Sequence, residues 1–325
     1  MNIKSFVILF LAFVWLNPLV AQYDFDAKER ERMAKAGVKT KTEWTHDYVD
    51  GKPSAKGHRS SVTKYDARGN VTEIVNYNEA GEIILVDVYQ YDSRDNRVSH
   101  ERYQDNRKKL IYSQKAVYDA RGNKTREYGF DGAAAYNNTY RYHDNGKLSE
   151  ITYTIENALV EKRVFNYSGS KTEILIYDSN NNLTFKQENT YNSKGLLVSE
   201  KKVGSKGNVV HTLDLQYNNA GGLTEELRKR ADDKLDYQKL YEYDSENRPI
   251  KIETINLDGT KFVSNEYQYN NQGDLALESF KRNERAKEST TNKFTYDARM
   301  LYTEKDSYYA TYQLKYLFKY TYEFH

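Results

Sequence analysis

The sequence predicts an all-β protein: a long antiparallel meander of about twenty strands, curled into a shell, a spiral or an open barrel. Three observations lead to this prediction. A tyrosine motif recurs along most of the chain, the segments between its copies alternate polar and apolar residues, and tyrosine is abundant, with 31 residues against 12 phenylalanines. Tyrosine favours strands because its ring packs on a pleated surface while its hydroxyl finds a polar partner.

The motif is a tyrosine followed by a polar turn, as in "YDARGN" at Tyr65 and again at Tyr118. Successive copies are 24 to 27 residues apart, which indicates an internal repeat. Further turn signals lie halfway between the copies, so each repeat should contain two strands of about eight or nine residues and two tight turns. The copies begin at Tyr65, Tyr91, Tyr118, Tyr142, Tyr167, Tyr191, Tyr217, Tyr243, Tyr269 and Tyr296.

The residues that recur from copy to copy are those that form a tight turn. Asp66 stands where a side chain can accept hydrogen bonds from the turn backbone, and Gly69 stands where the chain needs a positive φ. Asn181 and Asn247 can replace glycine at this position, since asparagine tolerates the left-handed conformation. We assign the same structural role to Asp92, Asp119, Gly122, Gly146, Gly195, Gly221, Asp244, Gly273 and Asp297.

Between the turns, the side chains alternate with period two. A single hairpin buries too little apolar surface to offset the entropy lost on ordering. We therefore expect one cooperative array whose tyrosine face turns inward. In one example, the first face carries Leu235, Tyr237, Lys239, Tyr241 and Tyr243, and the second carries Asp236, Gln238, Leu240 and Glu242.

The N-terminal residues are expected to be an export signal. Residues 1–21 combine a positively charged start, the apolar run Ser5 to Leu16 and the sequence "NPLVA". This is the layout of a secretory signal peptide, which we expect to be cleaved after Ala21. The apolar run is shorter than the roughly 18 residues that a membrane-spanning helix needs.

The remaining chain divides into two predicted parts. Residues 22–37 should form a charged helix over Asp24 to Lys35, ended by Gly37, that caps the first edge strand. Residues 38–325 should form a single β-repeat domain, in which the segment up to Thr63 is a degenerate first repeat. The aromatic tail to His325 reads as the last strands.

The composition excludes several classes of site. There is no cysteine, which rules out disulfides, thiolate metal ligands and a cysteine nucleophile. The 49 Lys and Arg and the 47 Asp and Glu are interspersed, so there is no electrostatic footprint for nucleic acid or an anionic membrane. We expect neither a nucleic-acid partner nor a membrane span after removal of the signal.

No residue pattern points to catalysis, a metal or a cofactor. The six histidines lack the spacing of metal ligands, and His211 should be a core histidine because it shares a face with Leu213 and Leu215. Acidic turns at Asp92 and Asp178 resemble calcium loops but lack the glycine and the distant glutamate. We expect no enzyme.

Binding is better supported than catalysis, because aromatic side chains at a rim can form a platform for sugar rings. The simpler explanation for each of these tyrosines is a place in the core. The candidates are Tyr237, Tyr241, Tyr267 and Tyr269.

The copies "YDARGN", "YDSNNN", "YDSENR" and "YNSKG", at this spacing, resemble the YD repeats of Rhs and teneurin-type proteins. The resemblance covers about Thr40 to Asp297. It implies a β-strip that spirals into a hollow shell, and a cell-surface or carbohydrate-associated role. After Tyr296 there is neither a proline-rich boundary nor a domain long enough to be a toxin, so we expect a short variant without one.

The sequence therefore favours an exported, non-enzymatic binding or structural module, periplasmic or at a bacterial cell surface, with a glycan or an envelope or surface protein as partner. One alternative is an outer-membrane β-barrel, and another is a toxin-associated or immunity partner by analogy with the Rhs systems. The barrel alternative is disfavoured by charges on the face away from the tyrosines, at Lys201, Glu242, Lys251 and Glu253.

Overall fold

The computed structural model describes residues 25–325, which form one helix and 23 strands. The predicted signal peptide lies outside these residues. No helix in the described range is long and apolar enough to cross a membrane. The elements are α1 (Phe25–Ala36), β1 (Val38–Val49), β2 (Lys52–Pro53), β3 (His58–Tyr65), β4 (Val71–Tyr77), β5 (Ile83–Tyr91), β6 (Arg97–Gln104), β7 (Lys109–Tyr118), β8 (Lys124–Phe130), β9 (Ala135–Tyr142), β10 (Leu148–Ile155), β11 (Ala158–Ser168), β12 (Lys171–Tyr177), β13 (Leu183–Tyr191), β14 (Leu197–Gly204), β15 (Val209–Tyr217), β16 (Leu223–Arg230), β17 (Leu235–Tyr243), β18 (Pro249–Asn256), β19 (Lys261–Tyr269), β20 (Leu275–Phe280), β21 (Thr290–Tyr296), β22 (Tyr302–Tyr309) and β23 (Leu314–Phe324).

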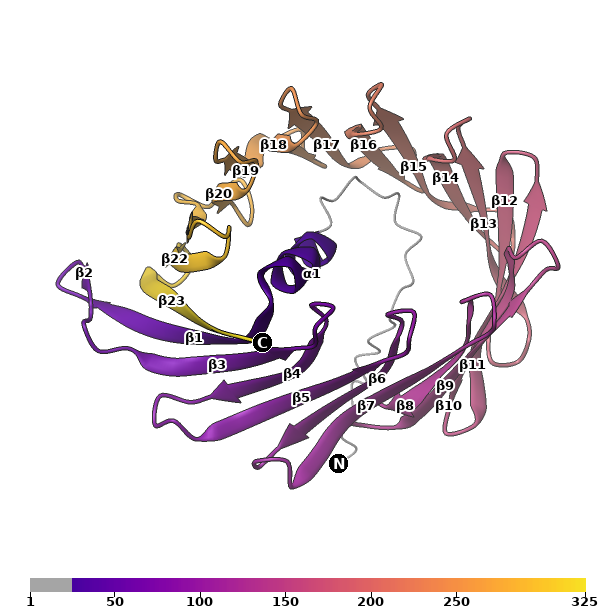
Figure 1. The fold of residues 1–325 in the computed structure, drawn as a ribbon. Coiled ribbons are helices and arrows are strands. Elements are labelled where there is room, and N and C mark those ends of the chain that lie inside the picture. Colours follow the sequence, from indigo (N-terminus) through magenta and orange to yellow (C-terminus); the bar gives the residue numbers. More distant parts are fainter. Residues whose placement is uncertain (1–24) are drawn as a thin grey trace, which may run out of the picture.

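The strands form a closed antiparallel barrel, seen as a ring in Figure 1. Successive strands from β3 to β23 pair with one another, and the short β2 pairs with β1. β1 also pairs with β3 on one side and with β23 on the other. The all-β meander predicted from the sequence is thereby confirmed, and the sheet closes into a barrel of 22 strands.

The motif turns line one rim of the barrel, which we call the tyrosine rim. The Asp66 carboxylate accepts hydrogen bonds from the backbone N–H groups of Arg68 and Asn70, both at 2.9 Å. Gly69 follows with a φ of +78°. Asn247 adopts a φ of +58° at the equivalent position of another motif turn, and Asn181 adopts +62° in the turn between β12 and β13, on the opposite rim. The register shifts beside the turn, between Lys64 and Tyr65 in this copy, as expected for a type I turn followed by a bulge.

The motif tyrosines tie each repeat to the one before it. The Tyr91 hydroxyl on β5 donates a hydrogen bond at 3.0 Å to the carbonyl oxygen of Val71, at the start of the preceding strand β4. Phenylalanine could fill the same space but could not make this bond. Eight of the ten motif tyrosines, and Tyr322 near the C-terminus, make the equivalent bond: Tyr91 to Val71, Tyr118 to Arg97, Tyr142 to Lys124, Tyr167 to Leu148, Tyr217 to Leu197, Tyr243 to Leu223, Tyr269 to Pro249, Tyr296 to Leu275 and Tyr322 to Tyr302.

The tyrosine face is the inner face of the barrel. The helix α1 lies within the ring and packs against this face (Figure 1). Met33 of α1 is fully buried against Val38, Tyr65 and Leu301. Elsewhere the core is divided into small clusters along the inner wall. One contains Tyr140, Ile151, Tyr153, Phe165, Ile174 and Ile176, and another contains Leu197, Leu213, Leu215 and Leu223.

The helix lies elsewhere than predicted, although its limits agree within one residue and Gly37 ends it with a φ of +66°. It was expected to cap an edge strand. No edge is left at β1, since β1 has a strand on each side. The helix instead bridges motif turns on both sides of the β1–β23 seam.

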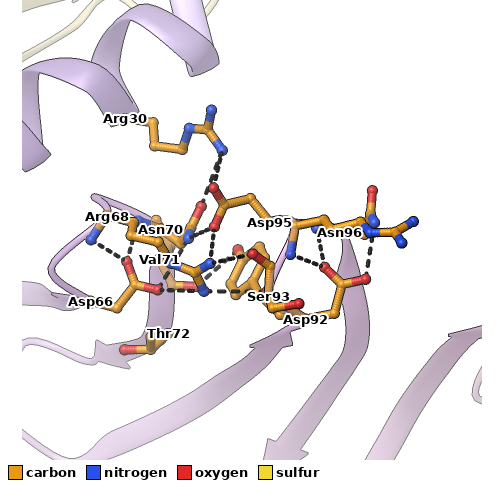
Figure 2. Close-up of polar contacts among 12 residues, drawn as sticks. Arg30, Asp66, Arg68, Asn70, Val71, Thr72, Asp92, Ser93, Asp95 and Asn96 are labelled. Carbon is orange, nitrogen blue, oxygen red and sulfur yellow. Dashed lines mark hydrogen bonds and ion pairs between the residues drawn. The ribbon is translucent and has the colours of Figure 1, made fainter. Parts of the chain in front are cut away.

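Polar contacts hold α1 to these turns. Arg30 approaches Asn70 at 3.4 Å and Asp95 at 3.8 Å on one side of the seam (Figure 2). On the other side, Arg32 pairs with the buried Asp274 carboxylate. Because Asn70 also donates to Asp95 at 2.9 Å, the helix joins a network that already links neighbouring turns.

Gly69 tests this packing, with Gly146 as a matched control. A Cβ at Gly69 would lie 2.1 Å from the Arg30 carbonyl oxygen of α1, whereas a Cβ at Gly146 would meet nothing within 4 Å. The φ values are nearly equal, +78° and +81°, so the backbone strain of alanine should be the same at both sites.

We therefore expect Gly69→Ala, but not Gly146→Ala, to displace the helix. Limited trypsin digestion should then cleave the Gly69→Ala variant within α1, at Arg30 and Arg32, at a rate at which the control stays intact. Equal cleavage of the two variants would contradict this role of the helix.

Candidate functional site

The outer face of the barrel carries ion pairs between neighbouring strands. Lys186 on β13 lies 2.6 Å from Glu173 on β12. Lys251 on β18 lies 2.8 Å from Glu242 on β17, and it is also in register with Glu266 on β19. These charges stand on the side opposite the tyrosines and are paired with one another.

The inner wall is the candidate binding surface, because its polar side chains are partnered from within and still reach solvent. Arg102 and Lys239 face inward and keep exposed fractions of 43% and 39%. Barrels of 16 to 18 strands already leave an aqueous channel. A closed barrel of 22 strands therefore has room for a solute beside its inner wall.

The best-defined cluster on this wall joins two predicted binding tyrosines to one carboxylate. The hydroxyls of Tyr237 and Tyr241 on β17 donate to the two oxygens of Glu226 on β16, at 2.5 and 3.0 Å. Lys239 lies 3.9 Å from the same carboxylate. Burial, together with the Glu226 charge, raises the pKa of both tyrosines, so both phenols remain protonated donors at neutral pH.

The other two predicted tyrosines lie on β19 and are not part of this cluster. The Tyr269 hydroxyl donates to the Pro249 carbonyl oxygen at 2.8 Å, and the Arg248 guanidinium lies 4.6 Å from its ring centroid. Burial, with the Glu278 charge, raises the pKa of Tyr267. The structure therefore places all four tyrosines on the inner wall but brings only Tyr237 and Tyr241 together.

A second inward-facing cluster was not found from the sequence. Asp87 on β5 is 3% exposed and accepts hydrogen bonds from His100 at 2.6 Å and Arg102 at 2.8 Å, both on β6. Burial opposes ionisation of Asp87, but these two bonds outweigh it and hold its pKa below the usual value. His100 also stacks on Tyr89, with ring centroids 4.4 Å apart.

His211 belongs to a third cluster. Its Nε2 lies 2.9 Å from Glu200 on the neighbouring strand, and Gln187 donates to the same carboxylate at 2.8 Å. The other histidines have different neighbours, such as the Ser54 carbonyl oxygen 2.8 Å from His46. Within residues 25–325 no three acidic, histidine or cysteine side chains come close enough to hold a metal ion.

Comparison with known proteins adds no family name: no family model matches the chain, and no curated protein matches it. Solved structures with a similar arrangement include a TcdB2-TccC3-TEV crystal structure, with 15% identity and a TM-score of 0.34 over 82% of this chain. The match spans only 16% of that chain.

Two porin-like proteins also match. The one from Bacteroides uniformis shows 15% identity and a TM-score of 0.33, over 65% of this chain and 94% of that one. The one from Bacteroides vulgatus shows 11% identity and a TM-score of 0.27, over 75% of this chain and 95% of that one. Likenesses at this level concern the β-architecture and carry no functional conclusion.

Tyr217 tests the hydrogen bonds of the motif tyrosines. Its hydroxyl donates to Leu197 at 2.8 Å, and burial with the nearby Glu226 charge raises its pKa to about 12. We expect Tyr217→Phe to lower the free energy of unfolding by about 0.5–1.5 kcal/mol at pH 7, the usual net value of one hydrogen bond.

That difference should shrink as the pH rises from 10 towards 12. The phenol has a higher pKa in the folded chain than in the unfolded chain, so its contribution is complete below pH 10 and is lost above it. Urea unfolding at several pH values measures this, with the outer-face Tyr177→Phe as control. A difference that does not change with pH would contradict the assignment.

Proposed function

We propose that this protein is an exported, non-enzymatic β-repeat shell that binds a ligand on its inner wall, as a binding or structural module at the bacterial cell surface or in the periplasm. A glycan is the ligand that we favour. The observation that carries the proposal is the difference between the two faces. Ion pairs occupy the outer face, whereas the inner wall presents tyrosine rings beside hydrogen-bonding groups.

Tyr237 and Tyr241 show how such a wall suits a sugar. An aromatic ring offers a flat apolar surface for the C–H face of a sugar, and a carboxylate accepts hydrogen bonds from its hydroxyls. Glu226 stands between the two tyrosines, and Lys239 adds a donor. The group therefore combines stacking surface with donors and acceptors, without an unpaired carboxylate that would suggest an acid–base catalyst.

The resemblance to YD repeats supports the same proposal. Its recurring tyrosine and turn form regular hairpins that follow one another around the barrel. A carbohydrate-associated role, which the resemblance implies, is extended here to this chain as part of the proposal.

An outer-membrane barrel is a weaker alternative. Such a barrel needs an apolar band about 25 Å tall on its outer face. Here Lys251 is flanked by Glu242 and Glu266, and Lys201 is exposed on β14. Charged side chains on the outer face, at the middle of a strand, would be costly in lipid.

Two experiments test the proposal. After expression with its N-terminal segment, the protein should be recovered from the envelope fraction without detergent, and recovery only with detergent would favour the membrane alternative. On a broad glycan array, the purified protein should bind a restricted set of glycans.

The array also distinguishes the inner wall from the outer face. Tyr237→Ala, which removes a ring and a donor to Glu226, should weaken glycan binding about tenfold or more, whereas Tyr177→Ala on the outer face should leave it unchanged. Thermal unfolding of both variants checks that they remain folded. A flat response across the array would count against the proposal.

A further inference from the structure

Basic side chains from three neighbouring strands form a row on the inner wall. Lys202 on β14 is in register with His211 on β15, which is in register with Arg230 on β16. Arg228 lies two residues from Arg230, on the same face of β16. Facing Cβ atoms on adjacent strands are about 4.5–5.5 Å apart, so Lys202 and Arg230 flank His211 and their long side chains can meet above it.

Three of these side chains, those of Lys202, Arg228 and Arg230, have hydrogen-bond donors without a partner. In the described part of the chain the Lys202 ammonium has neither a hydrogen bond nor an ion pair, and it lies 4.4 Å from the centroid of the Phe185 ring. The Nε atoms of Arg228 and Arg230 are buried without a hydrogen-bond partner. Asp236 lies 3.2 Å from the Arg228 Nε, but this contact is an ion pair without hydrogen-bond geometry.

The acidic groups nearby are already engaged. Glu200 accepts from His211 and Gln187, and Glu161 accepts from Arg163 at 2.6 Å. Glu226 accepts from the two tyrosines described above. Burial and the Arg163 charge lower the pKa of Lys202, and the charges of Glu161 and Glu200 oppose this shift without reversing it. An added anion would relieve this imbalance.

The row is accessible from the rim opposite α1, which we call the far rim. Lys202 lies two residues before the turn that starts at Gly204, and Arg230 opens the turn to Lys234. Both turns lie on the far rim. The Arg230 side chain is 42% exposed and the Arg228 side chain is 31% exposed. The Nη2 of Arg230 already donates a hydrogen bond to the Asp232 carboxylate at 3.4 Å, whereas its Nε has no partner.

We propose that Lys202, Arg228 and Arg230 form an oxyanion site that binds the phosphate or carboxylate group of a ligand. Arginine matches such groups with its planar fork of donors, and lysine adds a compact charge. This inference rests on the proposed function and deepens it: the sugar that stacks on the tyrosine wall is a phosphorylated or acidic one.

Isothermal titration calorimetry tests the site with four probes: glucose, glucose 6-phosphate, glucuronate and inorganic phosphate. Lys202→Gln is compared with Lys201→Gln, which removes an exposed lysine one residue away on the outer face of the same strand. Arg230→Gln provides a second inner variant, and Lys202→Arg keeps the charge. Circular dichroism checks that each variant is folded.

We expect glucose 6-phosphate or glucuronate to bind at least about tenfold more tightly than glucose, the difference expected from one or two charge-assisted hydrogen bonds. Lys202→Gln and Arg230→Gln should remove most of this advantage, while Lys201→Gln and Lys202→Arg should retain it. If inorganic phosphate binds as tightly as the sugar phosphate, with the same dependence on Lys202, the site is supported and its ligand is the free anion.

Three results would overturn the inference. One is equal binding of glucose, glucose 6-phosphate and glucuronate, which would leave the proposed glycan binding intact. Another is equal weakening by Lys201→Gln and Lys202→Gln, which would indicate a general surface effect. The third is binding of none of the anionic probes. Failure of the proposed function is recognised separately, by a flat glycan array.

Discussion

The pairing of β1 with β23 is the contact on which the rest of the structure depends. An open sheet of this width would leave two long edges with unpaired backbone groups, which invite aggregation. Nine residue pairs, from Val38–Phe324 to Asp47–Tyr316, join the two ends of the chain and remove both edges. The helix α1 then spans this seam, because it holds Asn70 and Asp95 on one side and Asp274 on the other.

Closure also explains the preference for tyrosine. Once the sheet is closed, the inward face must pack well enough to hold its curvature while still meeting solvent inside the barrel. Tyrosine meets both needs, since its ring packs on the inner face and its hydroxyl bonds to a carbonyl of the preceding strand, as Tyr243 does with Leu223 at 2.9 Å. The outer face has only to stay hydrated, and ion pairs such as Lys186–Glu173 suffice there. The two faces therefore differ in their chemistry, and the inner one is the place for a ligand.

Much of the fold could be predicted from the sequence because the signals are local. A turn needs an acceptor at Asp66 and a positive φ at Gly69, and strand alternation needs only neighbouring residues. Closure could not be predicted, because the curl of a wide sheet depends on strand tilt and stagger summed over all strands. The alternating aromatic residues of the last strand, Tyr316, Phe318, Tyr320 and Tyr322, were the one available signal that this strand has a partner.

The candidate site was predicted less completely, for a related reason. Tyr237 and Tyr241 stand out in one strand, but their acceptor Glu226 lies on another. Asp87 and His100 are 13 residues apart and meet only because β5 and β6 pair in a particular register. The bulge beside the motif turn between β5 and β6 shifts that register by one residue, whereas the turn between β11 and β12 has no such shift, so the pairs cannot be counted from the turns alone.

The most direct test of the account is whether the two ends of the chain are joined. The chain has no cysteine, so the pair Thr42→Cys and Thr321→Cys adds the only two thiols. These positions face each other on β1 and β23, within the Cα separation that a disulfide allows. Mild oxidation should form an intramolecular disulfide, seen as a shift in non-reducing electrophoresis. Thr42→Cys combined with Thr212→Cys should form none, because Thr212 belongs to β15, which lies across the ring from β1 (Figure 1). Absence of the first disulfide, or its formation only between molecules, would contradict a closed barrel.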